Sequence, residues 1–230
     1  AWCLDNPENL FNPDEFYRVG FDLTDILKPE YRPTEPILAC MFYMKNIMLK
    51  RVAVTRSVLV TVVEEFWLPA KYPTTQEFII DGLKTDRKLG GFLALVTQSP
   101  KDAINSPIFD TVVEQTVTKI LLPNPAAEYE GNYQRIGLTE KEFFDMKKLG
   151  EKSRKFLVKQ NMGSSIATLN LSGMSDEIAV LSGNSANVHI MYEAMKHCGS
   201  DHPDDWLPVF HLMRKGNDEL TRDNAVSTAI

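Results

Sequence analysis

The sequence lacks a hydrophobic run of the length that a membrane-spanning helix needs, which is about 20 residues. Its best candidate, residues 37–49, is interrupted by Lys45 and Asn46, and its methionines recur at helical spacing, so we expect a core helix there. Only three cysteines occur, widely spaced and without a C-x-x-C pair, which favours reduced thiols in a cytosolic compartment. Basic residues are outnumbered, and the net charge of −6 argues against a broad nucleic-acid-binding face.

Three motifs of known chemistry are also absent. No G-x-S-x-G elbow occurs, which argues against a serine hydrolase of that type. The group of His197, Cys198, His202 and His211 holds a single thiol and lacks paired ligands on two separate elements, so we expect no zinc or other metal site there. No G-x-x-x-x-G-K-[ST] loop for binding phosphate occurs in the 230 residues.

The most informative stretch that is present is residues 58–67, VLVTVVEEFW. Its β-branched run, too apolar to alternate, predicts a strand buried on both faces of a parallel sheet. Glu64 and Glu65 follow where this strand ends, and open α/β sheets bind ligands at the carboxyl ends of their strands. Adjacent side chains point to opposite faces, so one carboxylate can reach Mg²⁺ while the other faces an attacking water. The alternative is a charged strand end in a solvated turn.

The order of the remaining patterns predicts an α/β fold with a mainly parallel sheet flanked by helices, followed by a β-hairpin and further helices. Strands are expected at residues 18–23, 58–63, 92–97, 119–122, 154–160 and 165–171. Helices are expected at residues 37–49, 75–88, 107–116, 139–149, 186–197 and 203–215. Thr139 and Glu142 have the spacing of a capping box. We expect one domain, residues 1–216, and a flexible tail at residues 217–230.

Two further polar residues extend the candidate site. Gln98 directly follows the strand expected next to that of Glu65, and its amide offers both a donor and an acceptor to a phosphate or an attacking water. Arg87 lies near the end of the preceding helix, where a guanidinium could neutralise charge on a transferred phosphoryl group of a neighbouring subunit. The alternatives are a loop glutamine and a solvated cation that suits the helix dipole.

Six short motifs occur in an order that resembles a known family. They are EEFW at 64–67, DGLKT at 81–85, TQSP at 97–100, EQT at 114–116, LPNP at 122–125 and SRKFL at 153–157. Together they resemble the C-terminal RecA-like motor domain of the VirB-type traffic ATPases (the CagE/TrbE family) of type IV secretion and conjugation systems. The similarity runs from about residue 2 to residue 211, nearly the whole chain. It implies a partial RecA-like P-loop NTPase fold.

The resemblance also implies roles for particular residues. Glu64 takes the Mg²⁺-associated position, Glu65 the water-activating position, Gln98 that of a sensor and Arg87 that of an arginine finger, with Arg154 a second candidate cation near the subunit boundary. The implied cofactors are ATP and Mg²⁺. The implied assembly is a homo-oligomer, expected to be a hexamer, that powers pilus assembly and substrate export with other inner-membrane components and ATPases. The implied location is cytoplasmic, peripheral at the bacterial inner membrane.

Two departures from the family pattern leave alternatives open. The first acidic position is usually aspartate, and Glu64 is one methylene longer. The phosphate-binding loop lies upstream in the family, so we expect this chain to be the downstream part of a motor domain and inactive alone. A non-hydrolysing structural subunit of the secretion channel is the alternative function. A DNA-pumping motor is a third reading, against which the acidic balance counts.

Overall fold

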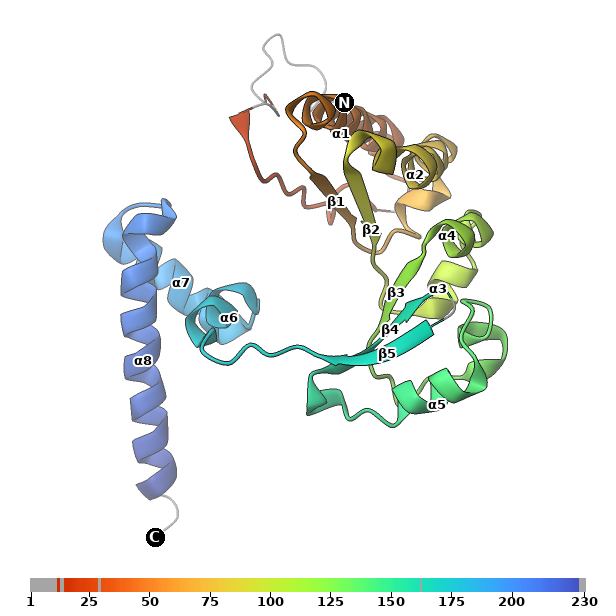
Figure 1. The fold of residues 1–230 in the computed structure, drawn as a ribbon. Coiled ribbons are helices and arrows are strands. Elements are labelled where there is room, and N and C mark those ends of the chain that lie inside the picture. The colour runs from red at the N-terminus through yellow and green to blue at the C-terminus, as the bar shows by residue number, and fades with distance from the viewer. Residues whose placement is uncertain (1–11, 13–14, 29, 162, 228–230) are drawn as a thin grey trace. The chain divides into compact units, whose positions relative to one another are not determined.

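The computed structural model describes residues 12, 15–28, 30–161 and 163–227, and the chain divides into two compact units, Ala1–Thr168 and Leu169–Ile230 (Figure 1). The strands are β1 (Leu59–Val63), β2 (Gly91–Leu95), β3 (Thr118–Leu121), β4 (Lys155–Gln160) and β5 (Gly163–Thr168). The α-helices of the first unit are α1 (Thr34–Thr55), α2 (Pro73–Thr85), α3 (Pro100–Ile104), α4 (Phe109–Gln115) and α5 (Glu140–Lys147). Its short helical turns are η3 (Pro69–Lys71), η4 (Asp86–Leu89), η5 (Tyr129–Tyr133) and η6 (Glu151–Ser153).

β1 and β2 form a parallel pair, in which Leu59 lies opposite Gly91 and Val63 opposite Leu95. This pairing confirms the two predicted strands and their parallel direction. One face of the pair packs against helices, because Val63, Leu93 and Leu95 contact a core built by residues of α1 to α4 and of the turn after β1. The buried centre of this core consists of Phe66, Ala70, Ile79, Ala103, Ile108, Phe109 and Val112.

The other face of the β1–β2 pair is uncovered. Val60 is 59% exposed, Val62 56% and Phe92 58%, while the residues between them point toward the helices. The prediction that the strand at residues 58–63 is buried on both faces is therefore wrong for this structure. The apolar residues that suggested two covered faces are present, and among the residues that the structure describes helices cover only one of the faces.

A buried ion pair fixes the turn between α2 and β2. Asp86, 3% exposed, pairs with Lys45 of α1, whose side chain is 11% exposed. A β-carbon on Gly91 would lie 2.7 Å from the β-carbon of Asp86, so the strand can start this close to the turn only with glycine. The predicted helix 75–88 thus ends as α2 at Thr85 and continues as the tighter turn η4.

β3, β4 and β5 form a separate antiparallel sheet, with β4 in the centre. β4 and β5 confirm the predicted hairpin, while β3, expected to belong to the parallel sheet, pairs with β4. α5 lies against this sheet and begins with the predicted capping box: the amide of Glu142 donates to Oγ1 of Thr139, and the amide of Thr139 donates to Glu142. The core here comprises Ala127, Tyr133, Leu138, Phe143, Met146 and Leu157.

The second unit holds three helices, α6 (Ser175–Leu181), α7 (Ser185–Cys198) and α8 (Pro203–Ser227). Ala179, Ala194, Trp206 and Phe210 form its buried core. α8 runs past the predicted end at residue 215, so that end is wrong, whereas the flexible tail and the domain of residues 1–216 stay predictions. Residues 18–23 contain no strand, although one was predicted there. The alternation of helices and strands along the chain confirms the predicted α/β class.

Candidate active site

Two neighbouring strand ends form the candidate site. Because β1 and β2 are parallel, with Val63 opposite Leu95, their carboxyl ends lie at one edge of the sheet. Beyond them, the amide of Val96 donates to the carbonyl of Val63 at 2.9 Å, and the amide of Phe66 donates to the carbonyl of Val96 at 3.3 Å. These bonds hold the two chains together past the strands, at the edge where open α/β sheets bind ligands.

Glu65 is held firmly at this edge. Its φ of 44° lies in the left-handed region, which is uncommon for a residue with a β-carbon, and the next residue, Phe66, is anchored in the core at 3% exposure. Its Oε2 accepts a hydrogen bond from the indole Nε1 of Trp67 at 2.6 Å, and its Oε1 accepts one from the backbone amide of Gln98 at 3.3 Å. Each carboxylate oxygen has a further lone pair, so the oriented group can still accept a proton from a water.

Gln98 meets Glu65 through its backbone. The structure brings the two residues together from strand ends that are 33 positions apart in the sequence. The side chain of Gln98 is exposed, so the contact with Glu65 does not use the side-chain amide that the sequence analysis singled out. The function of that amide toward a phosphate or a water stays a prediction.

Trp67 is a residue of this site that the sequence analysis did not assign. Its indole donates the shorter of the two hydrogen bonds to Glu65, and Nζ of Lys71 lies 4.7 Å from the centre of its ring. The signal in the sequence is its place two residues after Glu65, at the start of a turn that Phe66 ties to the core. Trp67 therefore orients the carboxylate.

Glu64 has a different environment from its neighbour. It follows β1 directly and its side chain is exposed, whereas Glu65 is half-buried. This difference agrees with the expectation that two adjacent side chains at a strand end cannot share one task. The exposed carboxylate of Glu64 is open to water and to hydrated cations.

Arg87 lies at the other end of β2 from Gln98. It belongs to the turn η4, which precedes the strand, and its side chain is exposed. The five residues of β2 separate this turn from the edge with Glu65, and at about 3.3 Å per residue they span roughly 17 Å. An arginine side chain does not bridge that length, so Arg87 does not join Glu65 and Gln98 within one chain.

Arg154 is also separate from the strand ends of β1 and β2. It is the exposed residue that ends η6, with a φ of 55°, and it precedes β4 of the antiparallel sheet. The structure thus brings together Glu65 and Gln98, places Glu64 beside them, and leaves Arg87 and Arg154 elsewhere. The chemical roles of all five stay predictions.

The match to a known family includes this site. A family profile described as the TraG P-loop domain matches residues 29–166, more than half of the chain, and this range contains β1, β2 and their carboxyl ends. The chain belongs to the TraG P-loop domain family. Nucleotide binding is the general property of P-loop domains, and the strand ends described above lie where such domains bind their ligands.

Curated relatives of this family come from type IV secretion systems. The type IV secretion system protein virB4 of Bartonella quintana is 40% identical over 216 residues, which are 94% of this chain and 26% of that protein. The virB4 protein of Brucella suis is 34% identical, and PtlC of Bordetella pertussis 32%, each over 214 residues, 93% of this chain and 25% of the relative. The chain therefore spans about a quarter of the length of these relatives. The resemblance to VirB-type ATPases inferred from the six motifs is confirmed.

A solved structure has a similar fold over two thirds of this chain. VirB4 of Thermoanaerobacter pseudethanolicus superposes with a TM-score of 0.53 at 19% identity, over 67% of this chain and 41% of that one. At this identity the likeness concerns the fold alone, and it confirms the predicted fold class of a P-loop NTPase. In the part of the chain that the structure describes, none of the helices combines the length and apolar character needed to cross a bilayer.

The residues at the strand ends fit the acidic half of a P-loop site. Mg²⁺ takes oxygen ligands and keeps several waters, and the carboxylates of Glu64 and Glu65 are oxygen donors of that kind. The phosphates of a nucleotide need a nest of backbone amides and a lysine. The 230 residues contain no G-x-x-x-x-G-K-[ST] loop to supply them. The chemistry of these two carboxylates would fit a bound Mg²⁺ and its water, and their roles stay predictions.

A cavity of about 170 Å³ lies on the helix-covered face of the antiparallel sheet, and two lysines line it. Lys119 and Lys159 are direct cross-strand partners, and burial, followed by the charge of Lys159, lowers the pKa of Lys119. Lys119 donates to the carbonyls of Val113 and Thr116 at the end of α4, and Lys159 pairs with Glu142. Both ammonium groups are engaged in holding α4 and α5 to the sheet, which indicates a structural role.

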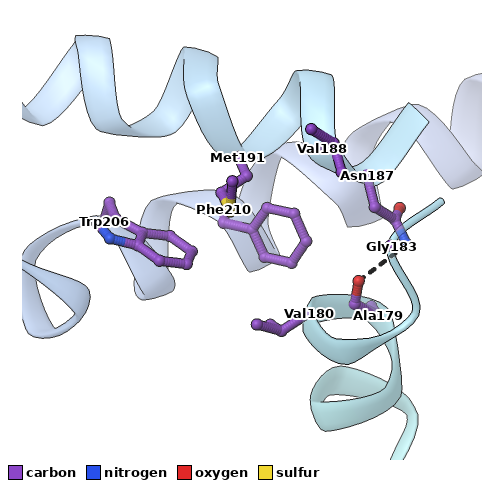
Figure 2. A pocket seen from close by; sticks show the side chains of 8 residues that line it. All are labelled: Ala179, Val180, Gly183, Asn187, Val188, Met191, Trp206 and Phe210. Carbon is purple, nitrogen blue, oxygen red and sulfur yellow. Dashed lines mark hydrogen bonds between the residues drawn. The ribbon is translucent and has the colours of Figure 1, made fainter. Parts of the chain in front are cut away.

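The hollow in the second unit is too small for a ligand. Figure 2 shows side chains of α6, α7 and α8 around it, with Nδ2 of Asn187 donating to the carbonyl of Ala179 at 3.0 Å. Trp206 and Phe210 close it from α8, and its volume is about 10 Å³. That is about the space of one water molecule, far below the several hundred Å³ of ligand sites. It is a small gap in the packing of three helices.

Proposed function

We propose that this chain is part of an ATP-hydrolysing motor subunit of a type IV secretion system, which powers pilus assembly and substrate transfer. One observation carries the proposal: the oriented carboxylate of Glu65 at the carboxyl end of a parallel strand, which accepts a hydrogen bond from the backbone amide of Gln98 beyond the end of the neighbouring strand. A general base must be held within reach of the water that it activates, and a carboxylate fixed by two donors is held in that way. The relatives named as secretion-system proteins indicate the biological setting.

The residues divide the proposed chemistry between them. Glu65 accepts the proton of the attacking water, and Glu64 holds the water shell of Mg²⁺. Gln98 senses the terminal phosphate of ATP with its exposed side chain. Arg87, which lies away from its own chain's strand ends, reaches the nucleotide of a neighbouring subunit, with Arg154 as the second candidate cation. ATP bound with Mg²⁺ supplies the phosphoryl group that is transferred to water.

The assembly that we propose is a ring. An arginine that acts across a subunit boundary requires neighbouring copies, so the motor works as a homo-oligomer, proposed to be a hexamer. Its other partners are inner-membrane components and ATPases of the same secretion system, and we place it on the cytoplasmic side of the inner membrane as a peripheral protein. The net charge of −6 gives no support to DNA as a direct partner.

The Glu65→Gln substitution in the complete protein tests this function. Glutamine keeps the size of the side chain and an acceptor for Trp67 but removes the base, so turnover is expected to fall at least a hundredfold while ATP still binds. Glu77→Gln, on the exposed side of α2, is the matched control and should leave the rate unchanged. A Glu65→Gln protein that hydrolyses ATP at a near-normal rate contradicts the assigned base.

That result would favour a second function, a subunit that uses the same fold only to assemble on the secretion channel. The observation on its side is Glu64, an exposed side chain one methylene longer than the aspartate usual at this position. A longer side chain without fixed orientation coordinates a metal less well. A protein of this kind would bind its partners equally well with Gln at both acidic positions, which a pull-down of the secretion complex can measure.

A further inference from the structure

The turn that follows β1 places Lys71 over the side chain of Trp67. The amide of Leu68 donates to the carbonyl of Glu65 at 2.8 Å, and the amide of Lys71 donates to the carbonyl of Leu68 at 3.2 Å, so the chain winds helically here. Trp67 and Lys71 are four positions apart, the spacing at which side chains of a helical turn lie one above the other. Nζ of Lys71 lies 4.7 Å from the centre of the indole ring, within the range of a cation–π contact.

The backbone that carries Lys71 is anchored in the core. The preceding residue, Ala70, is 0% exposed, and its carbonyl accepts a hydrogen bond from Nε2 of Gln76 on α2 at 2.9 Å. The amide of Ala70 donates to the carbonyl of Phe66 at 3.1 Å, and Phe66 is itself buried. The ammonium of Lys71 forms no ion pair with any of the described residues. Its charge over the ring is therefore not neutralised by a carboxylate.

The same indole donates to the candidate base. Nε1 of Trp67 lies 2.6 Å from Oε2 of Glu65, whereas the amide of Gln98 lies 3.3 Å from Oε1. A cation over the face of an indole attracts its π electrons, so the N–H becomes more positive and a stronger donor. Hydrogen bonds to a charged acceptor are the stronger class. Lys71 thus strengthens the shorter of the two bonds that orient the carboxylate.

We propose that Lys71 is a positioning residue for Glu65 and that it acts through the indole of Trp67. Neither Lys71 nor Trp67 contacts water or nucleotide in this role, and together they fix the direction of the carboxylate. The effect on turnover rests on the proposed function, because Glu65 accepts a proton only in that reaction. The effect on the hydrogen bond between Trp67 and Glu65 does not depend on it.

Nuclear magnetic resonance of the chain measures this hydrogen bond without ATP. The chain contains three tryptophans, so labelling them with nitrogen-15 gives three indole N–H signals, and Trp67→Phe identifies the signal of Trp67. A strong bond to a carboxylate moves the proton signal to higher chemical shift. Lys71→Met should lower that shift, in the same direction as Glu65→Gln, which offers a neutral acceptor. Lys71→Arg keeps a cation that stacks on aromatic rings and should resemble the parent.

ATP turnover of the complete protein measures the consequence for the base. Because Lys71 is exposed, its contact is expected to be worth a two- to fivefold effect, so Lys71→Met should lower kcat about threefold. KM for ATP should not change, since a poorly oriented base affects turnover and not binding. Lys71→Arg should restore the rate. Lys50→Met, at an exposed position of α1, is the matched control for the lost charge.

A double-mutant cycle tests whether Lys71 acts through the indole N–H. Trp67→Phe keeps an aromatic ring under the cation but removes the donor, so kcat should fall at least tenfold. Adding Lys71→Met to Trp67→Phe should then have no further effect. An unmoved Trp67 signal in Lys71→Met overturns the proposal. So does an equal loss of turnover in Lys71→Met and Lys71→Arg, or a full threefold loss on top of Trp67→Phe.

The proposed function can fail separately from this inference. If Lys71→Met moves the Trp67 signal and the Glu65→Gln protein still hydrolyses ATP, Lys71 positions Glu65 and the catalytic assignment is wrong. If the signal does not move while Glu65→Gln abolishes turnover, the motor function holds and Lys71 has no part in orienting the base.

Discussion

Replacing Glu142 by glutamine is expected to loosen the antiparallel sheet by a predictable amount. Nζ of Lys159 lies 2.8 and 2.9 Å from the two carboxylate oxygens of Glu142, and the two side chains are only 13% and 12% exposed. Glutamine retains the capping bond to the amide of Thr139, because its oxygen still accepts. It removes the charge that balances Lys159, so a largely buried ammonium loses its counterion.

The size of the effect follows from the pKa of Glu142. Burial opposes its charged form, but hydrogen bonds from Lys159, from the amide and hydroxyl of Thr139 and from Ser164 outweigh burial and lower the pKa from 4.5 to about 2. At 1.36 kcal/mol per pKa unit this is roughly 3 kcal/mol, and partial solvent contact, screening and the capping bond that glutamine retains reduce the loss in Glu142→Gln to about 2 kcal/mol. Since the folded state has the lower pKa, this stability is present above pH 4.5 and is lost as the pH falls toward 2.

Native-state hydrogen exchange of peptides from residues 155–168 measures this stability locally. At pH 7 these peptides should open about 30-fold more often in Glu142→Gln, which corresponds to about 2 kcal/mol, and the difference should shrink as the pH is lowered toward 2. Glu140→Gln, at an exposed position in the first turn of the same helix, should open like the parent. An effect of equal size at both pH values, or an equal effect of the control, would refute the charge pair as its cause.

Three further predictions concern the parallel sheet and the site. Asp86→Asn leaves Lys45 charged and buried without its partner, so it should lower the free energy of unfolding by about 3 kcal/mol; a loss below about 1 kcal/mol in urea denaturation contradicts a buried pair. The isolated chain should show no binding of Mg-ATP by calorimetric titration, and micromolar affinity would show that it contains its own phosphate cradle. Arg87→Ala in the complete protein should lower turnover without changing nucleotide affinity, and mixing it with Glu65→Gln subunits should restore activity. A rate that stays flat against the mixing ratio removes Arg87 from the site.

Local chemistry was predictable from the sequence. The capping box of Thr139 and Glu142 depends on two residues at a fixed spacing, and the structure contains both of its hydrogen bonds. The meeting of Glu65 and Gln98 was predictable because each follows a β-branched or apolar run, and parallel strands end at the same edge of a sheet. Both contacts can be predicted from a few residues of the sequence, without knowing how distant elements pack.

Long-range partners were not predictable in the same way. The apolar run around Val60 and Val62 predicts that both faces of the strand are covered, whereas in the described part of the chain helices cover one face. Strand composition does not show which elements supply that cover. β3 pairs antiparallel with β4 because the hairpin returns beside it, and strand composition alone does not distinguish that neighbour from β2. The contact of Trp67 with Glu65 depends on a left-handed backbone at position 65. Glutamate rarely adopts that conformation, so the conformational propensities of these residues do not predict the contact.

The left-handed backbone at position 65 makes this site vulnerable when the protein is selected for heat resistance. A φ of 44° costs a residue with a β-carbon about 1 kcal/mol or more, and glycine adopts it freely. A variant library screened only for survival at high temperature should therefore enrich glycine or asparagine at this position. Such variants would melt later and would no longer have the carboxylate that Trp67 and Gln98 hold. Any thermostable version of this domain meant to keep its chemistry should be evolved with position 65 held fixed.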